Sequence, residues 1–157
     1  AFALDGFAFS AEALVGGAVG ARNRYQVRRA SVMASQWGVG GAFALGAIFY
    51  FAGPALIDLM STSPDVRLAA REYLIWAALA PVIGVASWMF DGIYIGATWT
   101  RDMRNAMIQS VAIYVVALFL LVPTLGNHGL WAALMVLNIT RGLTLGWRYP
   151  RLEAQIA

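Results

Sequence analysis

The sequence predicts an all-α fold, a polytopic membrane bundle of five transmembrane helices. Apolar residues make up 61% of the 157 residues, and the mean hydropathy is +0.68. Charged residues make up only 12%, whereas a soluble domain usually has about 25%. A chain of this length has a large surface to cover. We therefore expect lipid, and not water, to cover much of it.

The first span is expected over residues 1–21, which overlap the stretch ALDGFAFSAEALVGGAVGARNR at residues 3–24. The chain starts with Ala and shows no signal-peptide pattern, so we expect a fragment whose start falls inside a helix. Asp5 and Glu12 are seven residues apart, which places them about 10 Å apart on one helix face. The stretch therefore predicts a membrane helix with a polar stripe that is closed by arginines.

Four more spans follow from long runs with little or no charge. Residues 31–57 hold no charged residue, and residues 73–100 hold a single acid. Residues 105–140 hold none, but one helix of that length would reach about 54 Å, far beyond a hydrocarbon core of about 30 Å. We expect Pro123 and the turn stretch 126–129 to break this run. The predicted spans are 32–53, 73–98, 105–125 and 129–147.

The segment between the second and third spans is expected to be helical from Pro64, with Ser63 as the N-cap and Asp65 complementing the helix dipole. Within the third span, Pro81 can kink the helix and expose carbonyl groups. Small residues at four-residue spacing predict close helix packing in lipid: Gly16 and Gly20; Gly38, Ala42 and Gly46; Gly92 and Gly96.

The charges between the spans predict the orientation of the chain in the membrane. One side carries eight arginines, namely Arg22, Arg24, Arg28, Arg29, Arg101, Arg104, Arg148 and Arg151. The other side carries only Arg67 and Arg71, together with Asp58, Asp65 and Glu72. The positive-inside rule places the eight arginines, and with them the C-terminus, in the cytoplasm. We expect a multi-pass protein of the bacterial inner membrane.

Three carboxylates lie within the predicted spans: Asp5, Glu12 and Asp91. Acids inside a membrane are costly and usually face the bundle interior or a hydrated cavity. Asp91 could exchange a proton or bind a monovalent cation such as Na⁺, or it could form a structural hydrogen bond, and both readings stay open. For Asp5 and Glu12 a structural role is favoured.

Other polar residues offer weaker signals. Arg141 lies in the last span, and we expect its side chain to reach the cytoplasmic surface. His128 lies in a short outer turn, where a surface role is favoured over proton relay. Polar side chains that could line a cavity or join helices are Ser87, Asn105, Gln109 and Asn138.

The composition also excludes several kinds of protein. Without cysteine the chain has no zinc ribbon, disulfide scaffold or catalytic thiol, and one histidine cannot form a His-rich metal site. The arginines lie between apolar runs and not in one patch, so we expect no nucleic-acid partner. No soluble-enzyme motif is present, although intramembrane catalysis by Asp5 and Asp91 as a pair stays open. We expect a protein that is not an enzyme and binds no cofactor.

Three stretches resemble the second half of multidrug and toxic-compound extrusion (MATE) transporters, most closely the DinF-like, DNA-damage-inducible branch: ALDGFAFSAEALVGGAVGARNR, MSTSPDVRLAAREYLIWAALAPVIGV and FDGIYIGATWTRDMRNAM. The resemblance runs through almost the whole chain and ends with LGNHGLWAAL and the last span. It implies helices eight to twelve of a twelve-helix transporter whose N-terminal lobe is missing here. It also implies export of cationic, amphipathic small molecules in exchange for H⁺ or Na⁺.

The resemblance assigns roles to the three acids as well. Asp91 falls where some members carry an acid of the cation site, and Asp5 and Glu12 match acidic positions of the DinF-like eighth helix. A fragment of this kind is not expected to transport alone. Alternatives are a lipid-linked oligosaccharide flippase of related architecture, which would need a more cationic cavity, and a non-transporting membrane scaffold.

Overall fold

The computed structural model describes residues 2–156, and these residues form five α-helices. The helices are α1 (Phe2–Gly20), α2 (Arg24–Met60), α3 (Pro64–Gly96), α4 (Thr100–Leu125) and α5 (Asn127–Ala154). Each is long and apolar enough to cross a membrane. The prediction of an all-α membrane bundle with five spans is therefore confirmed.

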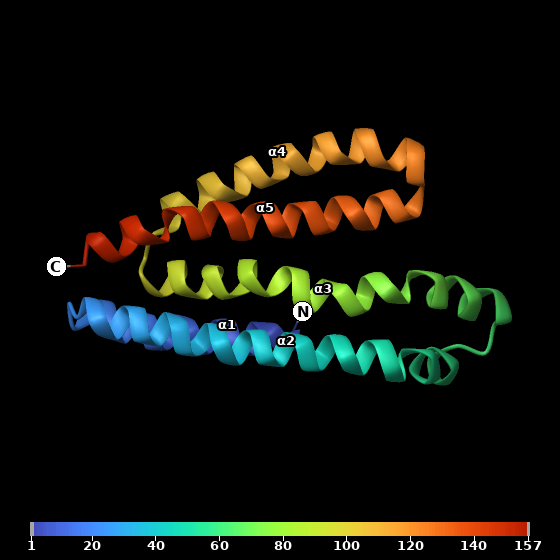
Figure 1. The fold of residues 1–157 in the computed structure, drawn as a ribbon, viewed down its shortest axis with the longest axis horizontal. Coiled ribbons are helices and arrows are strands. Elements are labelled where there is room, and N and C mark those ends of the chain that lie inside the picture. The colour runs from blue at the N-terminus through green and yellow to red at the C-terminus, as the bar shows by residue number, and fades with distance from the viewer. Residues whose placement is uncertain (1, 157) are drawn as a thin grey trace.

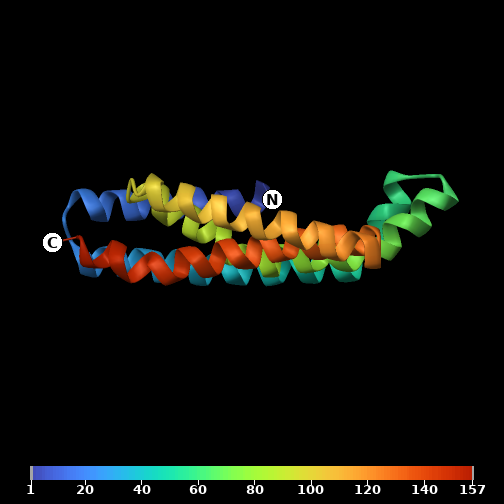
Figure 2. The same ribbon diagram turned by 90° about the horizontal axis from the view of Figure 1, so that it is seen from above.

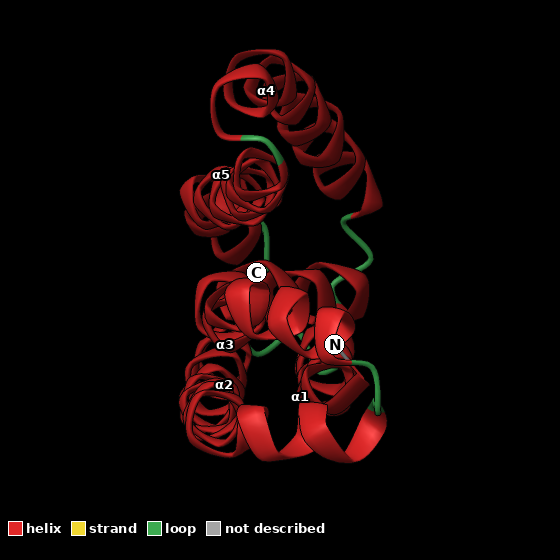
Figure 3. Cartoon of the chain, turned by 90° about the vertical axis from the view of Figure 1, so that its right-hand side faces the viewer, coloured by secondary structure: helices red, strands yellow, loops and turns green. Residues whose placement is uncertain are grey.

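Seen along the helix axes, the helices form an elongated stack and do not close into a ring (Figure 3). Helices α1, α2 and α3 pack against one another, α5 packs on α3, and α4 rests almost entirely on α5. Helix α1 starts about halfway along the bundle, as the N label in Figure 1 shows. The α1–α2 and α3–α4 turns lie at the same end as the C-terminus, which we call the C-terminal end; the other two turns lie at the far end. The α2–α3 turn projects beyond the rest of the bundle (Figure 2).

The helices are longer than most of the predicted spans. Helix α2 has 37 residues and begins at Arg24, where the backbone N–H of Gln26 donates to Asn23 Oδ1 over 3.1 Å and caps the helix. Helix α3 begins at Pro64, as predicted, but continues directly into the third span and ends at Gly96. Ser63 occupies the N-cap position, yet its side chain makes no capping hydrogen bond. Hydropathy detects the apolar core of a helix, and polar helical extensions fall outside that signal.

The break in the long uncharged run is shorter than predicted. Helix α4 continues through Pro123 to Leu125, and Gly126 alone separates it from α5. Gly126 has φ of 62°, a left-handed conformation that glycine adopts without steric cost. Asn127 and His128 already belong to α5, so the expected four-residue turn is wrong. Helix α3 is likewise continuous through Pro81, which is buried.

The small residues mostly act as predicted. A Cβ on Gly92 would collide with the backbone of Ala8, and one on Gly96 with the backbone of Glu12, so α1 and α3 touch backbone to backbone. A Cβ on Gly46 would lie 2.8 Å from the carbonyl oxygen of Ala78, so α2 also approaches α3 closely. Gly20 has no neighbour within 4 Å, and packing there is not as predicted.

Large apolar side chains cover the outer surface of the bundle. Phe51, Phe119 and Trp147 are 81%, 76% and 83% exposed. A soluble protein would not leave so many of them in contact with water. These side chains are suited to contact lipid.

Candidate functional site

The glycine contacts between α1 and α3 set the height of Asp91 in the bundle. Gly92 faces Ala8, and Gly96 faces Glu12, so the two helices run parallel in a fixed register. Asp91 precedes Gly92 by one residue and Asp5 precedes Ala8 by three. The two acids therefore differ by two residues in height, about 3 Å along the helix axis. Asp5 is indeed one of the charged neighbours of Asp91.

The second charged neighbour of Asp91 is Arg141, which reaches it from α5. Nη2 of Arg141 lies 2.8 Å from Oδ1 of Asp91. The arginine side chain is 20% exposed and the aspartate side chain 15%. The expectation that Arg141 extends to the membrane surface is therefore wrong. A nearby carboxylate compensates the charge inside the bundle, and this contact joins two helices whose sequence separation gave no hint of it.

The Asp91–Arg141 contact is close but incompletely hydrogen-bonded. Oδ1 of Asp91 and Nε of Arg141 are both shielded from solvent and have no hydrogen-bond partner among the described residues. The short distance thus reflects an ion pair without the alignment of a good hydrogen bond. Buried polar atoms of this kind are usually satisfied. The pair consequently retains unused capacity to bind another group.

The remaining predicted acids are placed nearby without partners of their own. Asp5 and Glu12 are partly buried, and neither forms an ion pair within residues 2–156. Glu12 lies level with Gly96, five residues and about one and a half helical turns from the level of Asp91, towards the C-terminal end. With Asp5 and Asp91 both ionised, the Asp5–Asp91–Arg141 cluster carries one net negative charge.

The four polar residues expected to line a cavity are scattered. Ser87 is buried and donates to the carbonyl of Gly84 in its own helix over 2.8 Å. Asn105 is exposed on α4, and Gln109 accepts a hydrogen bond from Arg148. Asn138 lines an apolar groove of about 700 Å³ between α3 and α5. The structure does not bring these four together at one site.

Two grooves beside α5 are apolar. The groove that Asn138 lines also includes Phe90 and Trp147, and a second groove of about 490 Å³ lies between α2, α3 and α5. Phe90 lines both grooves, and neither is lined by Asp91 or Arg141. The acid cluster is therefore distinct from these two apolar grooves.

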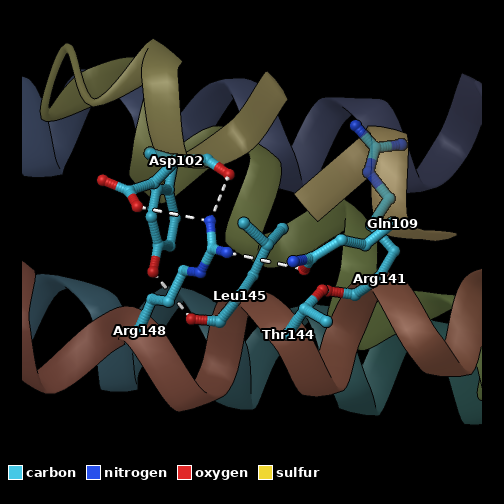
Figure 4. A network of polar contacts seen from close by, with 7 residues as sticks. Asp102, Gln109, Arg141, Thr144, Leu145 and Arg148 are labelled. Carbon is cyan, nitrogen blue, oxygen red and sulfur yellow. Dashed lines mark hydrogen bonds and ion pairs between the residues drawn. The ribbon is translucent and has the colours of Figure 1, made fainter. Parts of the chain in front are cut away.

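Sequence reasoning missed a polar network at the C-terminal end (Figure 4). Nη1 of Arg148 donates to the backbone and side-chain oxygens of Asp102 over 3.2 and 3.3 Å, and Nη2 donates to Gln109 over 3.4 Å. Close by, the buried hydroxyl of Tyr94 donates to the carbonyl of Leu145 over 2.7 Å. These contacts fasten α4 and α3 to α5. The sequence shows the arginines and acids of these helices, but which of them pair depends on how the helices pack.

A second polar contact lies at the far end, around His128 in the first turn of α5. Its Nε2 is 3.2 Å from Oε1 of Glu72, and Nε1 of Trp76 donates to its Nδ1 over 3.0 Å. The ring also lies 4.8 Å from that of Tyr73. His128 is therefore partly exposed, as a surface role implies, but it also joins α5 to α3.

Comparisons with known proteins show the family of this chain. The family model described as MatE matches residues 1–122. DNA damage-inducible protein F of Escherichia coli (strain K12) is 39% identical over 150 residues, which is 94% of this chain and 32% of that protein. The chain thus spans about a third of the length of this relative. The search of solved structures gives no match.

Proposed function

Since the chain belongs to the MatE family, we propose that it forms part of the C-terminal lobe of a secondary transporter that exports cationic, amphipathic small molecules. Influx of H⁺ or Na⁺ would drive the export. Asp91 is the proposed cation-binding residue, with Asp5 and Glu12 as further acids of the same cavity. The single observation that carries the proposal is the cluster of Asp5, Asp91 and Arg141 between apolar helices, in which the acids outnumber the arginine two to one.

The proposed mechanism follows from charge competition. A substrate cation and the coupling ion both require a carboxylate, and one site can compensate only one of them at a time. Protonation of Asp91, or Na⁺ bound to it, would weaken substrate binding, and loss of the coupling ion would restore it. Alternating exposure of the site to the two sides of the membrane turns this competition into exchange. The substrate, the bilayer and the N-terminal lobe are the proposed partners.

Export by the full-length protein tests the proposal. Asp91→Asn should abolish most ethidium export from energised vesicles while membrane insertion remains normal. Asp65→Asn is the matched control, because Asp65 is an exposed acid on the same helix. Dissipating the proton gradient or removing Na⁺ identifies the coupling ion. Normal export by a well-expressed Asp91→Asn protein would contradict the proposal.

A flippase for lipid-linked oligosaccharides is the second candidate function. It would need free positive charge for a pyrophosphate group. Arg141 is a cation inside the bundle, but Asp91 already compensates it at 2.8 Å. The charge balance of the site therefore favours a cationic substrate. Movement of a labelled lipid headgroup by the full-length protein would support the flippase instead.

A further inference from the structure

Arg141 occupies the place where a bound cation would sit on Asp91. Its Nη2 lies 2.8 Å from Oδ1, within direct contact distance of the carboxylate. The other five ion pairs of the described residues lie at helix ends or at turns. The Asp91–Arg141 pair joins α3 and α5 away from the ends of α5.

The contact is also easier to exchange than a fully bonded pair. Asp91 Oδ1 and Arg141 Nε are buried without hydrogen-bond partners. A guanidinium group has five N–H donors in a rigid fork and can bond a carboxylate through two of them. This pair does not use that geometry. An incoming cation would therefore displace one ionic contact and not a set of aligned hydrogen bonds.

The net charge of the Asp5–Asp91–Arg141 cluster determines how much positive charge a bound ligand can contribute. Asp5 and Asp91 supply two negative charges, and Arg141 supplies one positive charge. Without Arg141 the cluster would carry two net negative charges. With it, one remains, which a single monovalent cation or proton can balance.

From these observations we infer that Arg141 is a built-in counter-cation that competes with the transported cation for Asp91 and limits the site to one positive charge. This inference rests on the proposed function, because it assigns a specificity role at the same site. Arg141 acts through Asp91 and Asp5 and need not touch the substrate. It thereby weakens binding enough to permit release.

Equilibrium binding of radiolabelled tetraphenylphosphonium to the purified full-length protein tests the inference. Arg141→Gln should tighten binding about tenfold, since one repelling charge is removed near the bound cation. Asp91→Asn should weaken it about tenfold. The double variant Asp91→Asn/Arg141→Gln keeps the net charge of the native cluster and should bind within about threefold of the native protein. Arg148→Gln, on the same helix, is the matched control and should leave binding unchanged.

The two proposals fail in different ways. Unchanged or weaker binding by Arg141→Gln, with weaker binding by Asp91→Asn, would overturn the counter-cation role and leave the proposed cation site standing. Unchanged binding by Asp91→Asn would overturn the proposed site itself. A double variant that binds as weakly as Asp91→Asn would also contradict a role based on charge count.

A variant that leaves one buried charge unpaired can fail to fold, and a second comparison covers that case. The double variant leaves neither charge and is expected to fold. Adding Asp5→Asn removes the last net charge, so the triple variant should bind at least tenfold more weakly than the double. Monodisperse elution in detergent confirms folding of both. Equal binding by the double and triple variants would overturn the inference.

Discussion

Two arginines of α5, seven residues apart, each face an aspartate on another helix, yet the two contacts differ in kind. Arg148 at the C-terminal end shares its guanidinium among the backbone and side chain of Asp102 and the amide of Gln109. Arg141 has one ionic contact, to Asp91, and in this pair Nε of the arginine and Oδ1 of the aspartate have no hydrogen-bond partner among the described residues. The several hydrogen bonds of Arg148 hold helices together. The single contact of Arg141 is suited to exchange, and this difference indicates that the Asp91–Arg141 pair belongs to a binding site.

The largest expected effect is on stability, to which the two ion pairs should contribute unequally. Asp91→Asn leaves Arg141 uncompensated inside the bundle and should lower the free energy of unfolding by about 3 kcal/mol. Asp102→Asn should cost only about 1 kcal/mol, because Arg148 retains other acceptors and lies near the bundle end. Unfolding of the full-length protein by SDS in mixed micelles measures both. Adding Arg141→Gln to Asp91→Asn should recover more than half of the loss; no recovery would show that the charges do not compensate one another.

A backbone change beside Asp91 should have the next largest effect. Gly92→Ala places a methyl group against the backbone of Ala8, where neither helix can yield by moving a side chain. Separating α1 from α3 should cost about 2 kcal/mol. It should also reduce export, because Asp91 moves relative to Asp5.

Gly6→Ala is the control for that change. Gly6 lies in α1 and has no atom within 4 Å of the added methyl group. It should be neutral or stabilising by up to about 1 kcal/mol, the gain in helix propensity. Equal losses for both variants would mean that the glycine contact does not hold the site in place.

The sequence predicted the packing of these helices better than their polar contacts. Gly92 and Gly96 could be placed at a helix contact because small residues at four-residue spacing have one common use in lipid. The contact between Arg141 and Asp91 could not be predicted, since the two residues are 50 positions apart and lie on helices joined through α4. A lone arginine near a span end fits a surface anchor equally well. The extension of α2 beyond its apolar core was missed because its polar residues give no hydropathy signal. The helix from Pro64 was predicted, but its continuity with the third span was not.

Substitution of Arg148 should lower the free energy of unfolding less than substitution of Asp91. Arg148→Gln removes several long hydrogen bonds, of 3.2 to 3.4 Å, between α4 and α5. The cost should be about 1 kcal/mol. Helix α4 contacts little besides α5, so amide hydrogen exchange should quicken in the first turns of α4. Unchanged exchange there, with faster exchange around Asp91, would reverse the roles assigned to the two arginines.

The smallest effect is expected at the far end of α5, where His128 extends the comparison to a third contact. The indole N–H of Trp76 can only donate, so Nδ1 of His128 must accept and the ring proton lies on Nε2, which can then donate to Glu72. Trp76→Phe removes that donor from a partly exposed site and should cost about 0.5 kcal/mol. Trp147→Phe is the control, because Trp147 is 83% exposed.

Nitrogen-15 NMR of histidine-labelled full-length protein reads the tautomer directly, with His128→Gln to assign the signal. At a pH where the ring is neutral, Nδ1 should show the shift of an unprotonated, hydrogen-bonded nitrogen. Trp76→Phe should move the chemical shift of Nδ1, and Trp147→Phe should leave it unchanged. A protonated Nδ1 in the native protein would mean that the indole does not bond to the ring. The contact between α3 and α5 would then depend on Glu72 alone at this end, and Asp91 would be the more important of the two tethers between these helices.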